Sequence, residues 1–150
     1  MDRFDPARPD RLFHAGTFNN DVLTMAAGHA GLTQVLSADV LAAVNGRGET
    51  LRAALNGQFQ AAGLAMTASG LGSILSVHFR PGPILRPDDL EGEDPRLKQL
   101  FHLAMLARGI YLSPRGMMAL SLPMGDTETD ALLDAVAGFI EDHHPLLPKA

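Results

Sequence analysis

The chain has 150 residues, a length that suits one domain, and 46% of them are apolar while 19% are charged. Its formal net charge of -5 offers no basic surface for nucleic acid or for an anionic membrane. The absence of cysteine excludes disulfides and thiolate metal sites, and no run of about 18 apolar residues is present to span a bilayer. The acidic residues near the first methionine do not fit a secretion signal, so the sequence predicts a cytoplasmic protein.

Near the start of the chain lies a segment with the features of an anion site. Residues 14–20 are His-Ala-Gly-Thr-Phe-Asn-Asn, and a run of apolar and small residues follows over 22–36. Polar residues at 19–21 are good N-caps, so the spacing predicts that a helix begins there. Free amides at a helix start, together with the helix dipole, favour an anion, Gly16 permits close backbone approach and Thr17 adds a hydroxyl donor. The pattern suits a phosphate group, and it also suits a capped helix without a ligand.

The middle of the chain shows helical and strand patterns in turn. Ser37 is a plausible N-cap for a helix that ends at Gly63, because apolar residues between them recur at steps of three and four. Residues 64–69 and 73–79 are predicted to be strands, the second with alternating apolar and polar side chains. Prolines and acidic residues predict a loop over 80–93.

The last third of the chain completes an α+β pattern. Asp94 is the expected N-cap of a helix that ends at Gly109. Short strands are predicted over 110–112 and 117–122, and Thr127 with an aspartate three residues later predicts the start of a final helix. The fold class that follows is α+β, with a small, mainly antiparallel sheet and helices on one face.

Residues 16–28, Gly-Thr-Phe-Asn-Asn-Asp-Val-Leu-Thr-Met-Ala-Ala-Gly, resemble a segment of the class III pyridoxal-phosphate-dependent aminotransferases, most closely the glutamate-1-semialdehyde 2,1-aminomutase branch. The resemblance continues to the end of the chain. It implies that residues 1–36, an extended arm plus a helix, are the tail end of the large cofactor-binding domain, and that residues 37–150 are the small C-terminal domain. It also implies a dimer in which Gly16 and Thr17 contact the cofactor phosphate of the other subunit.

The same resemblance implies covalent chemistry for which this chain lacks the residue. The family holds pyridoxal 5'-phosphate as a Schiff base on a lysine. The chain has two lysines, Lys98 on the expected outer face of a helix and Lys149 beside the last residue, and neither stands in the sequence context of that lysine. We therefore expect no catalytic residue here, cofactor contacts from Gly16 and Thr17 alone, and no activity of the chain by itself.

Other candidate residues carry weaker patterns. Arg115, between two predicted strands, could pair with a substrate carboxylate or be a solvated turn residue. The six histidines contain no i,i+4 pair, so no metal site is expected. Residues 70–72, Gly-Leu-Gly, lack the strand-to-helix setting of a nucleotide-binding loop and are interpreted as a turn.

Two functions follow from the sequence. The first is the C-terminal part of a transaminase or glutamate-1-semialdehyde aminomutase-like enzyme, which transfers an amino group on an amino acid or aminoaldehyde. The alternative is a non-catalytic interaction or dimerisation module derived from that family, suggested by the apolar residues over 22–36 and 117–124. In both cases we expect a homodimer or association with a chain that carries the large domain, and no nucleic-acid or membrane partner. A regulatory domain that binds an amino acid has only fold-level analogy behind it.

Overall fold

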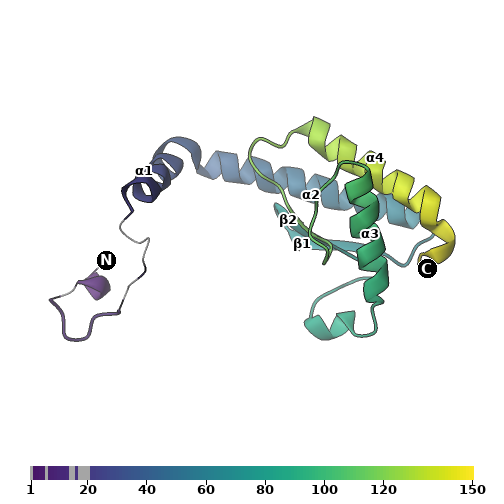
Figure 1. Cartoon of the computed structure of the whole chain (residues 1–150), viewed down its shortest axis with the longest axis horizontal. Coiled ribbons are helices and arrows are strands. Elements are labelled where there is room, and N and C mark those ends of the chain that lie inside the picture. Colours follow the sequence, from purple (N-terminus) through teal and green to yellow (C-terminus); the bar gives the residue numbers. More distant parts are fainter. Residues whose placement is uncertain (1, 6, 14–15, 17–20) are drawn as a thin grey trace. The chain divides into compact units, whose positions relative to one another are not determined.

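The chain forms two compact units, Met1–Ala38 and Asp39–Ala150 (Figure 1). The computed structural model describes every residue except 1, 6, 14, 15 and 17–20. The assignment of residues 1–36 to the large cofactor-binding domain and of residues 37–150 to the small domain stays a prediction.

Helix α1, Val22–Ala30, is the main element of the first unit. Its N-cap is Asp21, whose carboxylate accepts the backbone N–H of Thr24 at 2.7 Å, and this hydrogen bond lowers the pKa of Asp21. A π-helical stretch, Gly31–Val35, continues the helix. No residue of α1 is buried, and its exposed large apolar side chains are Val22, Leu23 and Met25.

The second unit contains three helices and a three-stranded sheet. The helices are α2 (Ala38–Ala61), α3 (Pro95–Ala107) and α4 (Asp126–His143), and the strands are β1 (Thr67–Leu71), β2 (Ile74–His78) and β3 (Met117–Ala119). The strands are antiparallel, in the order β1-β2-β3, with Thr67 opposite His78 and Leu75 opposite Met118. Short 3-10 turns lie at Pro87–Leu90 and His144–Leu146. The predicted α+β class with a small antiparallel sheet is confirmed.

Helices cover the face of the sheet that carries Ala68, Leu75 and Val77, as the sequence predicted. The core that they enclose is centred on three phenylalanines, Phe79, Phe101 and Phe139, which meet edge to face with ring centroids 5.0, 6.0 and 6.3 Å apart. Helix α2 adds apolar side chains that are almost fully buried, Leu51, Leu55 and Phe59. Helices α2, α3 and α4 therefore each contribute an apolar stripe to one core.

Helix starts follow the sequence signals with one difference. Asp94 caps α3 as predicted, since its carboxylate accepts a backbone N–H of the first turn at 2.9 Å. For α4 the predicted start at Thr127 is wrong. The helix begins at Asp126, because Gly125 provides the N-cap and its N–H donates to the carboxylate of Glu128 at 2.7 Å.

Two strand predictions near the end of the chain also differ from the structure. Residues 110–112 form no strand, because some of their backbone groups bond elsewhere. The N–H of Ile110 donates to a carbonyl at the end of α3 at 2.9 Å, and the carbonyl of Leu112 accepts from Nδ1 of His102 at 2.9 Å. The strand predicted over 117–122 is present as β3 but ends earlier, at Ala119.

Candidate functional site

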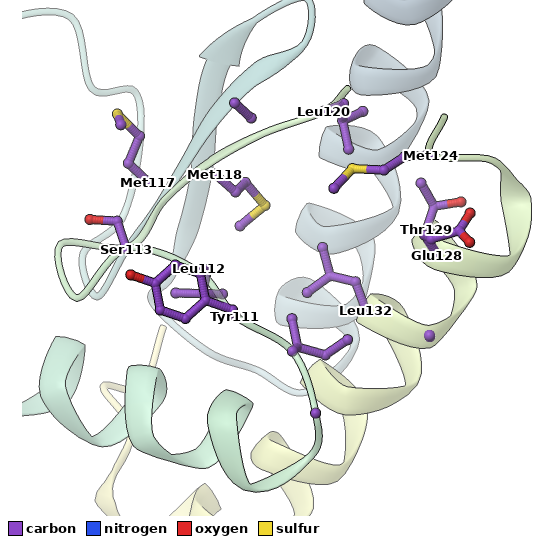
Figure 2. Close-up of a pocket in the computed structure, with 14 residues that line it drawn as sticks. Tyr111, Leu112, Ser113, Met117, Met118, Leu120, Met124, Glu128, Thr129 and Leu132 are labelled. Carbon is purple, nitrogen blue, oxygen red and sulfur yellow. The ribbon is translucent and has the colours of Figure 1, made fainter. Parts of the chain in front are cut away.

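A cavity of about 470 Å³ opens at the edge of the sheet, beside β3. Residues 109–113, β3 with the segment after it, and the first turns of α4 surround the cavity (Figure 2). Most of the lining side chains are apolar, and they include Leu112, Met118, Leu120, Met124 and Leu132. The volume lies in the range of small-molecule pockets, and the chemistry of the lining favours an apolar occupant.

Few polar groups of the lining are free to bind a ligand. Glu128 accepts a backbone N–H at the start of α4, and this hydrogen bond lowers the pKa of Glu128. The hydroxyl of Thr129 donates to two carbonyls of the same turn, at 3.0 and 3.2 Å. The hydroxyl oxygen of Ser113 accepts the N–H of Arg115 at 3.3 Å. Apart from the exposed Tyr111, the polar side chains of the pocket are thus engaged within the chain.

The pocket lies between the two arms of a hairpin. The tip of the hairpin is closed, because the N–H of Ser113 donates to the carbonyl of Met117 at 3.1 Å and the N–H of Gly116 to that of Ser113 at 2.8 Å. Beyond the tip, the arms 110–112 and 118–120 share no backbone hydrogen bond in the described part of the chain. Figure 2 shows the arms separating, with the side chain of Met118 between them and Leu132.

Arg115 occupies the hairpin tip and is exposed. The next residue, Gly116, has φ +83°, and a Cβ there would lie 2.6 Å from the carbonyl oxygen of Val77, so glycine is required. The N–H of Val77 also donates to the carbonyl of Gly116 at 3.0 Å. The backbone around Arg115 is therefore fixed, while its guanidinium forms no ion pair with any described residue.

Neither lysine is placed to capture an aldehyde. The Nζ of Lys98 lies 2.8 Å from Oε2 of Glu93, and the Lys98 side chain is only 17% exposed, so the expected outward position of this residue is wrong. The Nζ of Lys149 lies 2.5 Å from the carbonyl oxygen of His144 and 3.0 Å from its Nδ1. Neither residue lines the pocket. The described residues therefore do not fit a Schiff-base site for pyridoxal 5'-phosphate.

The structure gives partial information on the two predicted phosphate contacts. Gly16 is exposed, and Thr17 lies outside the described residues. At the helix start that follows them, the carboxylate of Asp21 already accepts the N–H of Thr24 and places negative charge there. A phosphate at this end of the molecule would therefore depend on the residues before Asp21. The cofactor roles of Gly16 and Thr17 stay predictions.

A polar cluster that the sequence analysis missed lies at the end of β2. His78 is 5% exposed, its Nε2 lies 2.9 Å from the hydroxyl oxygen of Ser69, and its Nδ1 has no hydrogen-bond partner among the described residues. Burial, and to a lesser degree nearby Lys98, lower the pKa of His78, while Glu93 acts in the opposite direction. Glu93 also accepts the N–H of Phe79 at 2.7 Å. Alternation along the strand places His78 on the polar face, but it gives no sign of these partners.

Each helix in the described ranges is too short or too polar to cross a membrane. Within those same ranges, no three side chains of His, Asp or Glu gather closely enough to hold a metal ion.

No protein-family model matches the chain. The chain is 45% identical over 150 residues to the β-phenylalanine transaminase of Variovorax paradoxus, a match that covers 100% of this chain and 34% of the relative. Over 148 residues it is 34% identical to an uncharacterized aminotransferase of Schizosaccharomyces pombe, a match that covers 98% of this chain and 33% of the relative. Over 139 residues it is 32% identical to a glutamate-1-semialdehyde 2,1-aminomutase of Desulforapulum autotrophicum, a match that covers 91% of this chain and 32% of the relative. The chain thus spans about a third of the length of the curated relatives it matches.

Solved structures share the same arrangement of elements. The β-phenylalanine aminotransferase of Variovorax paradoxus matches with a TM-score of 0.92 and 45% identity, covering 100% of this chain and 35% of that one. An ω-transaminase of Sphaerobacter thermophilus matches with a TM-score of 0.77 and 29% identity, and the match covers 95% of this chain and 33% of that one. A glutamate-1-semialdehyde aminomutase of Pseudomonas aeruginosa matches with a TM-score of 0.75, and the match covers 90% of this chain and 31% of that one. Because the identity is 17%, this match shows the fold alone.

Proposed function

Because the chain belongs to the class III pyridoxal-phosphate-dependent aminotransferases and matches their C-terminal part, we propose that residues 37–150 act as the small domain of a transaminase and residues 1–36 as the end of its large domain. The reaction of the whole enzyme would transfer an amino group on an amino acid or aminoaldehyde. The observation that carries the proposal is the joint match in sequence and structure to one enzyme, at 45% identity and a TM-score of 0.92 over the whole chain.

We propose a substrate that combines a carboxylate with an apolar group. The name of the Variovorax relative specifies β-phenylalanine, which has both features. Arg115 supports the carboxylate part of this proposal, because its guanidinium is exposed and unpaired among the described residues while its backbone is fixed. A planar guanidinium binds a carboxylate through two parallel hydrogen bonds. An aminomutase is the less favoured reaction, since the aminomutase relative above is 32% identical.

In this proposal, polypeptide outside these 150 residues supplies the cofactor-binding lysine. The contacts of Lys98 with Glu93 and of Lys149 with His144 support this division of roles. Gly16 and Thr17 would contact the cofactor phosphate held by the other subunit of a dimer. Each such hydrogen bond to a charged phosphate would contribute about 1.5–3 kcal/mol, so loss of Thr17 would weaken cofactor binding without abolishing the reaction. A cytoplasmic location and a dimeric state are parts of the same proposal.

A second candidate is a non-catalytic interaction module derived from the same family. The observation that favours it is the apolar surface of the first unit, where helix α1 buries none of its residues. Its exposed large side chains, with those of the π-helical stretch and the residue after it, are Val22, Leu23, Met25, Leu32, Val35 and Leu36. Such a surface is typical of a contact with another chain or domain. A monomer in size-exclusion chromatography with light scattering would count against this role.

The direct test replaces the matching third of the Variovorax enzyme with this chain, to give a full-length hybrid. We expect the hybrid to bind pyridoxal phosphate on a lysine outside this chain and to transaminate β-phenylalanine, and the chain alone to do neither. A hybrid that binds the cofactor but does not transaminate would favour the non-catalytic module. A folded hybrid that cannot bind the cofactor would contradict a role in this enzyme fold.

A further inference from the structure

The separated arms of the hairpin around Arg115 carry backbone groups that bond to no residue in the described part of the chain. In the β2-β3 ladder, Leu120 donates its N–H to the carbonyl of Ser73, and Gly116 accepts the N–H of Val77. Bonded pairs alternate along an antiparallel ladder, so Met118 bonds to β2 while the N–H and C=O of Ala119 point away from it. No described residue bonds the backbone of Ala119 on that side.

The opposite arm has the same property. The N–H and C=O of Tyr111 have no hydrogen-bond partner among the described residues. The two neighbours of Tyr111 are anchored, Ile110 to the end of α3 and Leu112 to His102, so this arm is held away from β3. Two extended edges therefore face a common space without bonding to each other.

The space between the arms is apolar. Figure 2 shows the side chains of Met118, Leu120, Met124 and Leu132 around this space, Met118 from β3 and Leu132 from α4. Glu128 is the charged residue of the lining, and its carboxylate is bonded at the start of α4. A charged group that entered this space would lose hydration without gaining a partner.

We propose that this slot between residues 110–112 and 118–120 accepts an extended polypeptide segment with apolar side chains at alternate positions. The segment comes from the part of the class III fold that this chain does not span, so the inference rests on the proposed function. In a strand, every second side chain faces the same way, so apolar side chains would reach Met118 and Leu132 while the backbone bonds to Tyr111 on one side and to Ala119 on the other.

Two observations favour a polypeptide over a small apolar ligand. The free N–H and C=O groups of Tyr111 and Ala119 match the backbone of a strand, whereas a small apolar molecule would bury them without partners. The chain covers 34% of the Variovorax relative, so about two thirds of that protein is polypeptide available to supply the segment.

Amide hydrogen exchange, resolved to single residues by mass spectrometry, tests the slot in the chain alone and in the full-length hybrid. We expect the amides of Tyr111 and Ala119 to exchange at least about tenfold more slowly in the hybrid, because a new hydrogen bond closes them. The natural Variovorax enzyme provides a second measurement if the hybrid folds poorly, since its residues aligned with Tyr111 and Ala119 should also exchange slowly.

A matched pair of variants separates the slot from general stability. Met118→Asp in the hybrid should restore fast exchange at Tyr111 and Ala119, while Leu103→Asp on the exposed side of α3 should not. Fast exchange at both residues in a hybrid that binds the cofactor would overturn the slot and leave the proposed function intact. If exchange at these two amides in the isolated chain became slower as its concentration rose, the occupant would be a second copy of the chain, and this result would also overturn the proposal. Failure of the hybrid to bind cofactor, with slow exchange in the natural enzyme, would contradict the proposed function instead.

Discussion

Two regions of the second unit carry similar apolar side chains in different surroundings: the core around Phe101, here called the closed end, and the hairpin around Arg115 beside β3, here called the open end. At the closed end, Phe101 and Met105 are 0% exposed, because three helices and the β1-β2 pair enclose them. At the open end, Tyr111 is 81% exposed and Met117 46%, because no described element covers their side chains. The difference teaches that an apolar pattern produces a buried face only where the chain supplies the facing element.

The largest expected effect is at the closed end. Phe101→Ala should lower the free energy of unfolding by about 3–5 kcal/mol, because it removes two edge-to-face contacts and leaves a cavity. Urea unfolding followed by circular dichroism measures the loss. Leu103→Ala, in the same helix at a residue that is 62% exposed, is the control and should change stability by less than about 0.5 kcal/mol. Equal losses for the two variants would contradict the described core.

One substitution made at both ends sharpens the comparison. Met105→Ala should cost about 2–5 kcal/mol, because the fully buried side chain leaves a cavity. Met118→Ala should cost less than half as much in the chain alone, because Met118 already borders open space. The same urea titration compares them. A larger loss at Met118 would mean that the slot is filled in the isolated chain.

The hairpin tip gives an intermediate effect. Gly116→Ala should cost about 1–3 kcal/mol, because its φ of +83° is unfavourable for alanine and the new Cβ would meet the carbonyl of Val77. Gly57→Ala is the matched control, since a Cβ there would meet no described atom within 4 Å beyond its own stretch of helix, and alanine favours the helix by about 0.5–1 kcal/mol. Thermal melts of the two variants should therefore shift in opposite directions. A shift in the same direction would argue against the fixed tip.

The smallest expected effect depends on pH. Burial lowers the folded-state pKa of His78 below its ordinary value of about 6.5, so the unfolded chain binds this proton more readily. The contribution of His78 to stability is therefore complete above pH 6.5 and is lost as the pH falls from there through the lowered pKa. His78→Gln, which retains a group able to bond Ser69, should reduce the loss. Identical stability profiles for the two proteins between pH 5 and 7 would show that His78 is not the group responsible.

Local signals in the sequence were sufficient for most of the fold. Gly63 and Gly109, predicted to stop helices, have φ of +65° and +78°, the left-handed conformation that glycine permits. The alternation along 73–79 gave a strand whose apolar side faces the core. Residues 110–112 were predicted wrongly because they have strand composition, while bonds from the end of α3 and from His102 hold them apart from β3.

Less of the candidate site than of the fold could be predicted from the sequence. The pocket depends on contacts between α4 and a hairpin whose arms diverge, and neither leaves a local pattern. The methionines at 117, 118 and 124 hinted at an apolar surface, but their positions around one space follow from the tertiary fold. Lys98 of α3 is buried by its ion pair with Glu93, which lies in the loop before the helix. The position of Lys98 in the helical pattern gives no sign of this partner, so the predicted outward orientation was wrong.

The most direct test of the account concerns where the cofactor becomes covalently attached. The chain alone and the hybrid enzyme are incubated with pyridoxal phosphate, reduced with borohydride, dialysed and digested for mass spectrometry. We predict one stoichiometric lysine adduct in the hybrid, at a residue outside this chain, and none at Lys98 or Lys149 in either sample. A stoichiometric adduct on one of those two lysines in the chain alone would contradict the account.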